Sequence, residues 1–160
     1  MAEEESVFAL VSKPIADLGT QEPVSIGLGS PLRHALELMR LKHLGCVLVV
    51  DEDGVLKGIV TERDFTMRVL GEKMNLDATP IEAIMTHAPE TLHPMHPIVY
   101  ALNRMDLGGY RHIPLVDQED KPVGLVSVKD IVEYLVDAIP EVVYNLPPEP
   151  NIYGNKPEGG

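Results

Sequence analysis

Apolar residues of this chain follow two different patterns, and each pattern predicts a different element. Leu32, Ala35, Leu36 and Met39 recur at the spacing of one helix face, so they predict a helix with a buried stripe. The run CVLVV at 46–50 is instead continuous, short and rich in β-branched residues, which favours a buried strand. The hydrophobic pattern therefore predicts a helix followed by a strand.

The segment after this strand predicts a hairpin and a second helix. DEDG at 51–54 is typical of a turn, and VLKGIV at 55–60 returns as a second strand. A second helix is expected from about 62 to 70, and a short extended piece at 24–26 precedes the first helix. The unit is therefore β-α-β-β-α.

The same pattern occurs twice in the chain. A shift of 66 residues aligns 14–70 with 80–136 without a gap, and 14 of the 57 pairs are identical. The second copy carries HIPLV at 112–116 in place of CVLVV and is expected to end in a helix over about 128–136. Such a repeat predicts an α+β fold in which two tandem β-α-β-β-α units pack with pseudo-twofold symmetry into one module.

The predicted organisation has five parts: an N-terminal segment (1–13), repeat 1 (14–70), a linker (71–79), repeat 2 (80–137) and a tail (138–160). The tail holds five prolines and three glycines, so we expect it to be extended or disordered. The alternative is an arm that wraps the core or a partner, anchored by Val143, Tyr144, Ile152 or Tyr153.

The ends of the first helix of each repeat carry recognisable signals. Ser30 followed by Pro31 predicts an N-cap with proline at the first helical position. Gly45 is expected to end this helix, and the pair Gly108 and Gly109 is expected to end its counterpart in repeat 2.

Composition and charge narrow the classes of partner. The net charge of −12 argues against nucleic acid, which needs a basic face, and against an anionic membrane surface. Cys46 is the only cysteine, so no intrachain disulfide can form. The start MAEEES lacks the features of a secretory signal, and no apolar run reaches membrane-spanning length. We therefore expect a cytoplasmic protein.

The motif GIVTERD at 58–64 returns as GLVSVKD at 124–130. In each copy a hydroxyl residue lies at a strand-to-helix junction and an aspartate follows three residues later. One interpretation is a helix capping box. The other is a ligand site, because a helix N-terminus suits phosphate and a carboxylate beside it can accept both hydrogens of a ribose diol. Arg63 or Lys129 would then meet the phosphate. The two interpretations are not exclusive.

These repeated motifs, with RHIPLVD at 111–117 preceding the second, resemble the CBS domain, named for cystathionine β-synthase. Two tandem copies resemble a Bateman module, and the resemblance covers residues 14 to about 137. It implies a pseudo-symmetric disc with two clefts between the repeats. Adenine would lie against the first hairpin strand and the linker of one repeat, and the ribose would meet the hydroxyl and aspartate of the other.

The resemblance assigns residues to each cleft. The first cleft would use Thr61, Arg63, Asp64, Thr86, Tyr110, Arg111, His112, Ile113 and Pro114. The second cleft would use Thr20, Leu44, Gly45, Cys46, Val47, Ser127, Lys129 and Asp130.

The two implied clefts are not equal. The first offers Tyr110 and His112 as stacking surfaces and two arginines for phosphate, whereas the strand facing the second offers neither aromatic nor cation. We expect the first cleft to bind more tightly. In the alternative interpretation, Arg68 pairs with Asp64 at i,i+4, and Tyr110 and His112 simply cover the sheet edge.

Three hypotheses for function follow. The first is a non-catalytic regulatory module that binds AMP, ADP, ATP, S-adenosylmethionine or a dinucleotide, pairs its helix faces as a homodimer and acts on a separate effector protein. The second is a constitutive dimerisation scaffold with degenerate clefts. The third is a metal-dependent enzyme, and it rests only on His87, His93 and His96, which no helix or hairpin geometry aligns as metal ligands. No nucleophile–base pair or P-loop is present in the sequence, so no catalysis is expected.

Overall fold

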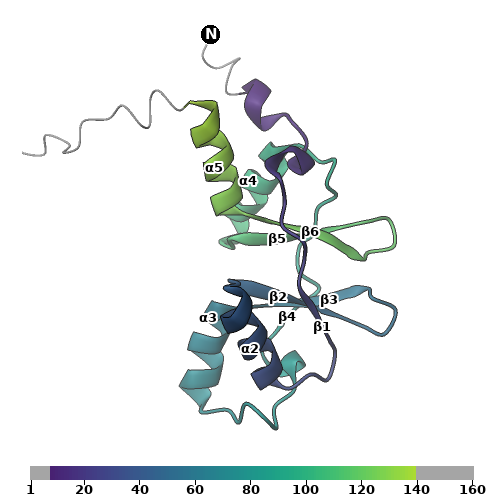
Figure 1. Cartoon of the computed structure of the whole chain (residues 1–160), viewed down its shortest axis with the longest axis vertical. Coiled ribbons are helices and arrows are strands. Elements are labelled where there is room, and N and C mark those ends of the chain that lie inside the picture. Colours follow the sequence, from purple (N-terminus) through teal and green to yellow (C-terminus); the bar gives the residue numbers. More distant parts are fainter. Residues whose placement is uncertain (1–7, 140–160) are drawn as a thin grey trace, which may run out of the picture.

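The two repeats fold into two halves stacked along the long axis of the molecule (Figure 1). The computed structural model describes residues 8–139. The first half contains β1 (Ser25–Gly27), α2 (Leu32–Lys42), β2 (Cys46–Val50), β3 (Leu56–Thr61), α3 (Glu62–Asp64), the π-helix η2 (Phe65–Leu70), the 3-10 helix η3 (Ile81–Ala83) and β4 (Thr86–His87). The second half contains the 3-10 helix η1 (Ile15–Leu18), α4 (Ile98–Gly108), β5 (His112–Val116), β6 (Pro122–Ser127) and α5 (Val128–Ala138). The chain is thus an α+β fold of two tandem repeats.

The two hairpins have the same register, which is the clearest sign of the pseudo-symmetry. Leu48 pairs with Ile59 in the first hairpin, and the residues 66 positions later, Pro114 and Leu125, pair in the second. The register shifts at the equivalent place in both hairpins. Leu56 N donates to Asp120 O at 3.0 Å, so the turns of the two hairpins lie side by side, as Figure 1 also shows.

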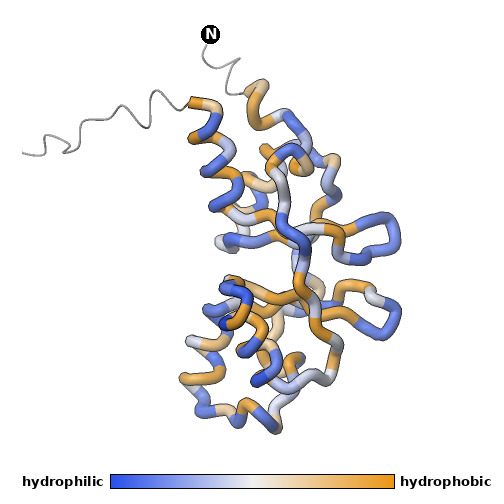
Figure 2. The backbone as a smooth tube through the Cα atoms, viewed as in Figure 1, coloured by the Kyte–Doolittle hydropathy of each residue, from blue (hydrophilic) through white to orange (hydrophobic). Residues whose placement is uncertain are grey.

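The continuous apolar run of β2 is explained by burial on both faces. Val47 and Val49 pack into the core of the first half under its helices. Cys46 and Leu48 point the other way and form a small cluster with Ile59 between the halves. The hydropathy colouring shows apolar strands inside and hydrophilic hairpin turns outside (Figure 2). Within residues 8–139, no helix is long and apolar enough to span a bilayer.

Each sequence repeat lends its first segment to the other half. Ile15, at the start of repeat 1, is fully buried in the core of the second half. Ile81, Ile84 and Met85, at the start of repeat 2, are buried in the core of the first half. Met85 lies so close to Gly58 that an added Cβ there would fall 2.5 Å from its sulfur. This exchange ties the halves together, because the start of each repeat packs into the core of the other half.

Two of the predicted helix ends are wrong. Pro31 has extended geometry (φ −67°, ψ 149°) and is itself the N-cap of α2, so the helix begins one residue later than predicted. The carbonyl of Ser30 instead accepts from Ile81 N at 2.8 Å, so pairing with the linker outweighs the local cap signal. α2 ends at His43 in the left-handed region (φ 54°), before Gly45. Gly109 (φ 67°) ends α4 as predicted.

The predicted tail lies outside the described residues apart from its first two positions. Ala138 is the last residue of α5, and Ile139 is its C-cap. The four residues proposed to anchor an arm also lie outside the described part of the chain.

Candidate functional site

Both copies of the repeated motif form complete capping boxes. Thr61 donates from its N–H and its hydroxyl to Asp64 Oδ2 at 2.9 and 2.8 Å, and Asp64 N donates back to Thr61 Oγ1 at 3.4 Å. Ser127 and Asp130 repeat this arrangement at 2.7, 2.7 and 3.2 Å. The cap interpretation is therefore confirmed in both copies. The caps use one carboxylate oxygen, Oδ2, and leave Oδ1 free of these bonds.

Arg68 contacts Asp64 only loosely. Its Nε lies 3.9 Å from Asp64 Oδ1, whereas its Nη1 donates to Ile84 O at 2.9 Å. The predicted i,i+4 pair exists, but the stronger bond of Arg68 holds the segment exchanged from repeat 2. Asp64 Oδ1 thus retains acceptor capacity for a further partner.

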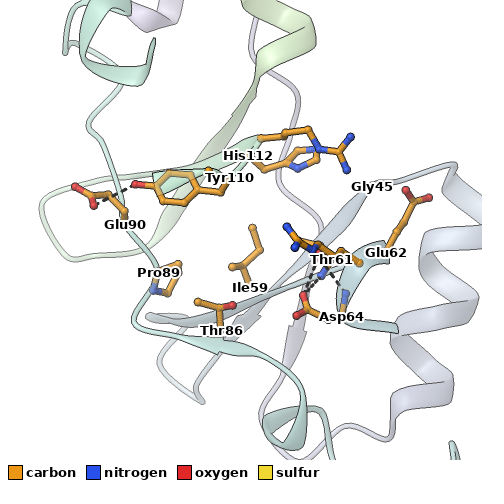
Figure 3. A pocket seen from close by; sticks show the side chains of 13 residues that line it. Gly45, Ile59, Thr61, Glu62, Asp64, Thr86, Pro89, Glu90, Tyr110 and His112 are labelled. Atoms are coloured by element: carbon orange, nitrogen blue, oxygen red, sulfur yellow. Dashed lines mark hydrogen bonds between the residues drawn. The ribbon is translucent and has the colours of Figure 1, made fainter. Parts of the chain in front are cut away.

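A cavity of about 460 Å³, cavity 1, lies between the capping box of repeat 1 and the segment before β5 (Figure 3). Its lining comprises Gly45, Ile59, Thr61, Glu62, Arg63, Asp64, Thr86, Pro89, Glu90, Gly109, Tyr110, Arg111 and His112. It brings together seven of the nine residues assigned to the first cleft. The other two, Ile113 and Pro114, are buried behind its wall.

A second cavity of about 560 Å³, cavity 2, lies at the capping box of repeat 2. Its lining comprises Gln21, His43, Leu44, Gly45, Cys46, Glu62, Arg111, His112, Leu125, Ser127, Val128, Lys129, Asp130 and Val132. It brings together six of the eight residues assigned to the second cleft. Val47 is instead buried in the core of the first half, and Thr20 places its hydroxyl over Gly124.

The two cavities share four lining residues: Gly45, Glu62, Arg111 and His112. Burial lowers the pKa of His112 and the charge of Arg111 lowers it further, while the carboxylates of Asp130 and Glu62 act in the opposite direction. His112 therefore stands between the cavities as a partly desolvated imidazole whose neutral form is favoured.

One end of cavity 1 holds a polar cluster of Glu90, Arg104 and Tyr110. Arg104 Nε lies 3.1 Å from Glu90 Oε1, and the Tyr110 hydroxyl donates to Glu90 Oε2 at 3.2 Å. Burial and the nearby carboxylate of Glu90 raise the pKa of Tyr110, so its hydroxyl remains a donor. The ring of Tyr110 lies over Gly108, where an added Cβ would overlap it.

Cavity 2 lacks a comparable polar cluster at the corresponding place. Leu44 occupies the position equivalent to Tyr110, and the neighbouring Cys46 is 4% exposed. Burial raises the pKa of the Cys46 thiol to about 12, so it remains a neutral, small apolar group. The polar part of the lining comes from Ser127, Lys129 and Asp130, from Gln21 and His43, and from the shared residues Glu62, Arg111 and His112.

The three histidines do not converge on a metal site. His93 N donates to His96 Nδ1 at 3.0 Å, and His93 Nδ1 accepts from Met95 N at 3.2 Å, so both rings order a local turn. His87 lies in β4, paired with Gly58 of β3. Among the described residues, no group of three or more His, Cys, Asp or Glu side chains is placed to hold a metal ion.

Sequence reasoning missed several lining residues, notably Glu62, Pro89 and Glu90. Glu62 lies inside the motif TERD and could have been included because it is the first residue of the capped helix. Pro89 and Glu90 follow directly from Thr86 along the exchanged segment. The carboxylate of Glu90 is particular to repeat 2, because its equivalent in repeat 1 is Val24, whereas Pro89 is matched by Pro23.

Comparison with known proteins agrees with this architecture. The family model of the CBS domain matches twice, over residues 15–71 and 81–137. The chain therefore belongs to the CBS domain family, as a tandem pair. A relative in Arabidopsis thaliana, the CBS domain-containing protein CBSCBSPB5, is 32% identical over 108 residues. That match covers 68% of this chain and 19% of the relative, so the chain spans about a fifth of the plant protein's length.

Two solved CBS structures share the fold. The CBS domain pair of protein MJ0100, in complex with 5′-methylthioadenosine and S-adenosyl-L-methionine, superposes with a TM-score of 0.71 at 24% identity. The match covers 78% of this chain and 97% of that one. CBS domain protein PAE2072 from Pyrobaculum aerophilum, complexed with AMP, superposes with a TM-score of 0.70 at 22% identity over 78% and 96% of the two chains.

Proposed function

We propose that the chain is a non-catalytic regulatory module that binds an adenosine-containing nucleotide in cavity 1. The observation that carries this proposal is Asp64, whose Oδ1 takes no part in the cap bonds and which lines a cavity of about 460 Å³ together with two arginines and a tyrosine. That volume falls within the usual range for small-molecule sites. The adenosine ligands bound by related CBS pairs support the same ligand class.

The lining of cavity 1 offers a suitable group to each part of the nucleotide, namely the ribose, the phosphate and the base. Asp64 Oδ1 accepts from the ribose hydroxyls, while the N-terminus of the capped helix and the guanidinium groups of Arg63 and Arg111 attract phosphate. The base packs between Ile59 and Tyr110, which supply an aliphatic and an aromatic surface. These contacts use residues from both repeats.

Cavity 2 is proposed as the weaker site. Asp130 presents the same free oxygen as Asp64, and Lys129 replaces Arg63. Leu44 and Cys46 provide no aromatic or donor surface for a base. The scaffold alternative, in which the clefts are degenerate, applies best to this cavity.

Binding can be transmitted because cavity 1 lies between the halves. A nucleotide that contacts both Asp64 and Tyr110 favours the arrangement of the halves that fits it best, which is a shift in population. We propose a homodimer as the regulated unit and a separate protein as its effector. The exposed side chains of Leu41 (79%) and Leu107 (76%), equivalent in the two repeats, support an apolar partner surface.

A thermal-shift panel of AMP, ADP, ATP, S-adenosylmethionine and divalent metals tests the proposal. A ligand at 100 times its dissociation constant stabilises the folded chain by about 2.7 kcal/mol. If none of the adenosine compounds stabilises the chain, the sensor proposal is overturned and the scaffold alternative is favoured. Stabilisation by metal alone, lost in His93→Ala, would favour the metal-dependent alternative.

A further inference from the structure

The two ends of cavity 1 present different chemical groups, and this favours one direction for a bound nucleotide. One end holds the helix N-terminus with Arg63, and Figure 3 shows Glu90 and Tyr110 at the opposite end, beyond Ile59. The first end offers donors to phosphate, whereas the carboxylate of Glu90 offers it only acceptor oxygens. A nucleotide bound as proposed above therefore directs its base toward Glu90.

The carboxylate of Glu90 is held in place but is not fully used. Arg104 and Tyr110 each occupy one of its oxygens, at 3.1 and 3.2 Å. Each oxygen of an ionised carboxylate has two lone pairs, so Glu90 can accept further hydrogen bonds but cannot donate any. Its side chain is 38% exposed and lines the cavity.

The fold itself does not require this polar cluster. The residues equivalent to Glu90, Arg104 and Tyr110 in repeat 1 are Val24, Leu38 and Leu44. All three of these pack against the core of the first half. The pseudo-symmetric unit is thus stable with apolar residues at these positions, and the acceptor at the base end is particular to cavity 1.

We propose that Glu90 is a specificity-determining residue, whose carboxylate accepts a hydrogen bond from the 6-amino group of the purine. The inference rests on the nucleotide site proposed above. A 6-oxopurine places an acceptor where the amino group stands, so its oxygen faces the carboxylate and is repelled. Arg104 and Tyr110 are positioning residues, which orient the carboxylate toward the base. Cavity 1 therefore selects adenine over hypoxanthine.

Isothermal titration of AMP and inosine monophosphate tests this, because the two nucleotides carry an amino group and an oxygen, respectively, at C6. For the unmodified chain we expect AMP to bind about tenfold more tightly, as for the loss of a hydrogen bond to a charged group. In Glu90→Gln the amide can donate to the 6-oxo group, so the ratio of the affinities for AMP and inosine monophosphate should fall toward one. Glu119→Gln removes the same charge from an exposed hairpin turn and leaves the preference unchanged.

The outcomes separate this inference from the site on which it rests. Equal affinities for AMP and inosine monophosphate, or a preference unchanged in Glu90→Gln, would overturn the role of Glu90 and leave the nucleotide site standing. Tighter binding of GMP than of AMP would overturn the assignment of the 6-amino group. Failure of all three nucleotides to bind would overturn this inference, and the proposed function falls with it only if no adenosine compound of the thermal-shift panel stabilises the chain.

Discussion

The imidazole of His112 lies directly against the backbone of Gly45, which belongs to the other half of the molecule. A Cβ built on Gly45 would fall 3.2 Å from both Cε1 and Nε2 of the ring. Both residues line both cavities. The absence of a side chain at Gly45 therefore sets the position of His112 in the wall between the two cavities.

Gly45→Val should displace His112 and weaken AMP binding in cavity 1. Overpacking of this kind costs about 1–3 kcal/mol of unfolding free energy. Urea unfolding and AMP titration measure the two effects. Gly27→Val is the matched control, because an added Cβ there meets nothing within 4 Å. Equal AMP affinity in Gly45→Val and the unmodified chain would contradict the account of the shared wall.

Gly108→Ala tests whether Tyr110 is held over the end of α4. Alanine in a helix normally stabilises by about 1 kcal/mol relative to glycine. Here its Cβ would overlap the ring of Tyr110, so we expect destabilisation, measured by urea unfolding. Gly71→Ala is the control, because Gly71 caps the C-terminal end of η2 and an added Cβ there would meet nothing within 4 Å. This substitution should leave the free energy of unfolding unchanged or raise it.

A second substitution identifies the source of this strain. Leu44 stands at the position equivalent to Tyr110, so Tyr110→Leu is compatible with the fold. Combined with Gly108→Ala, it should recover the lost stability, and the double-mutant cycle should give a coupling energy of about 0.5–3 kcal/mol. Simple additivity would show that the ring does not contact position 108.

The stability of the chain should depend on pH through His112. Burial holds its folded-state pKa below the ordinary value of 6.5, so the unfolded chain binds more protons as the pH falls below 6.5. This contribution to stability is present above 6.5 and is lost as the pH falls toward the folded-state pKa. His112→Gln should flatten this part of the profile of unfolding free energy against pH.

Arg111→Gln provides a second check on the same profile. Arg111 lowers the pKa of His112, so its removal should raise the folded-state pKa and reduce the pH dependence without abolishing it. Both variants have to be measured without ligand, because a bound phosphate would itself favour the protonated imidazole. A profile that is identical in all three chains would contradict this role of His112.

The sequence predicted correctly those elements that depend on residues close together in the chain. The hairpins follow from the apolar run 46–50 and its copy 112–116, and the capping boxes follow from the spacing of Thr61 and Asp64. The prediction that Ser30 caps the first helix is wrong, because its backbone pairs with Ile81 some fifty residues away. No local pattern encodes that pairing.

The parts of the site that were missed depend on the exchange of segments between the halves. Glu90 reaches cavity 1 because residues 80–88 cross onto the first half before the chain returns to the second. Gly45 was expected to end a helix, but His43 already does so, and Gly45 instead makes room for His112. These roles follow from contacts between residues distant in sequence, which a single sequence does not reveal.

The most direct test of the nucleotide site compares Asp64→Ala with Asp130→Ala in a titration with AMP. The two aspartates make the same cap bonds, so each substitution should cost a similar amount of stability, about 1 kcal/mol. Only the contribution to the ligand should differ. We predict that Asp64→Ala abolishes the tighter binding of AMP and that Asp130→Ala retains most of it. Equal losses in both variants, or the reverse order, would contradict the assignment of the nucleotide to cavity 1.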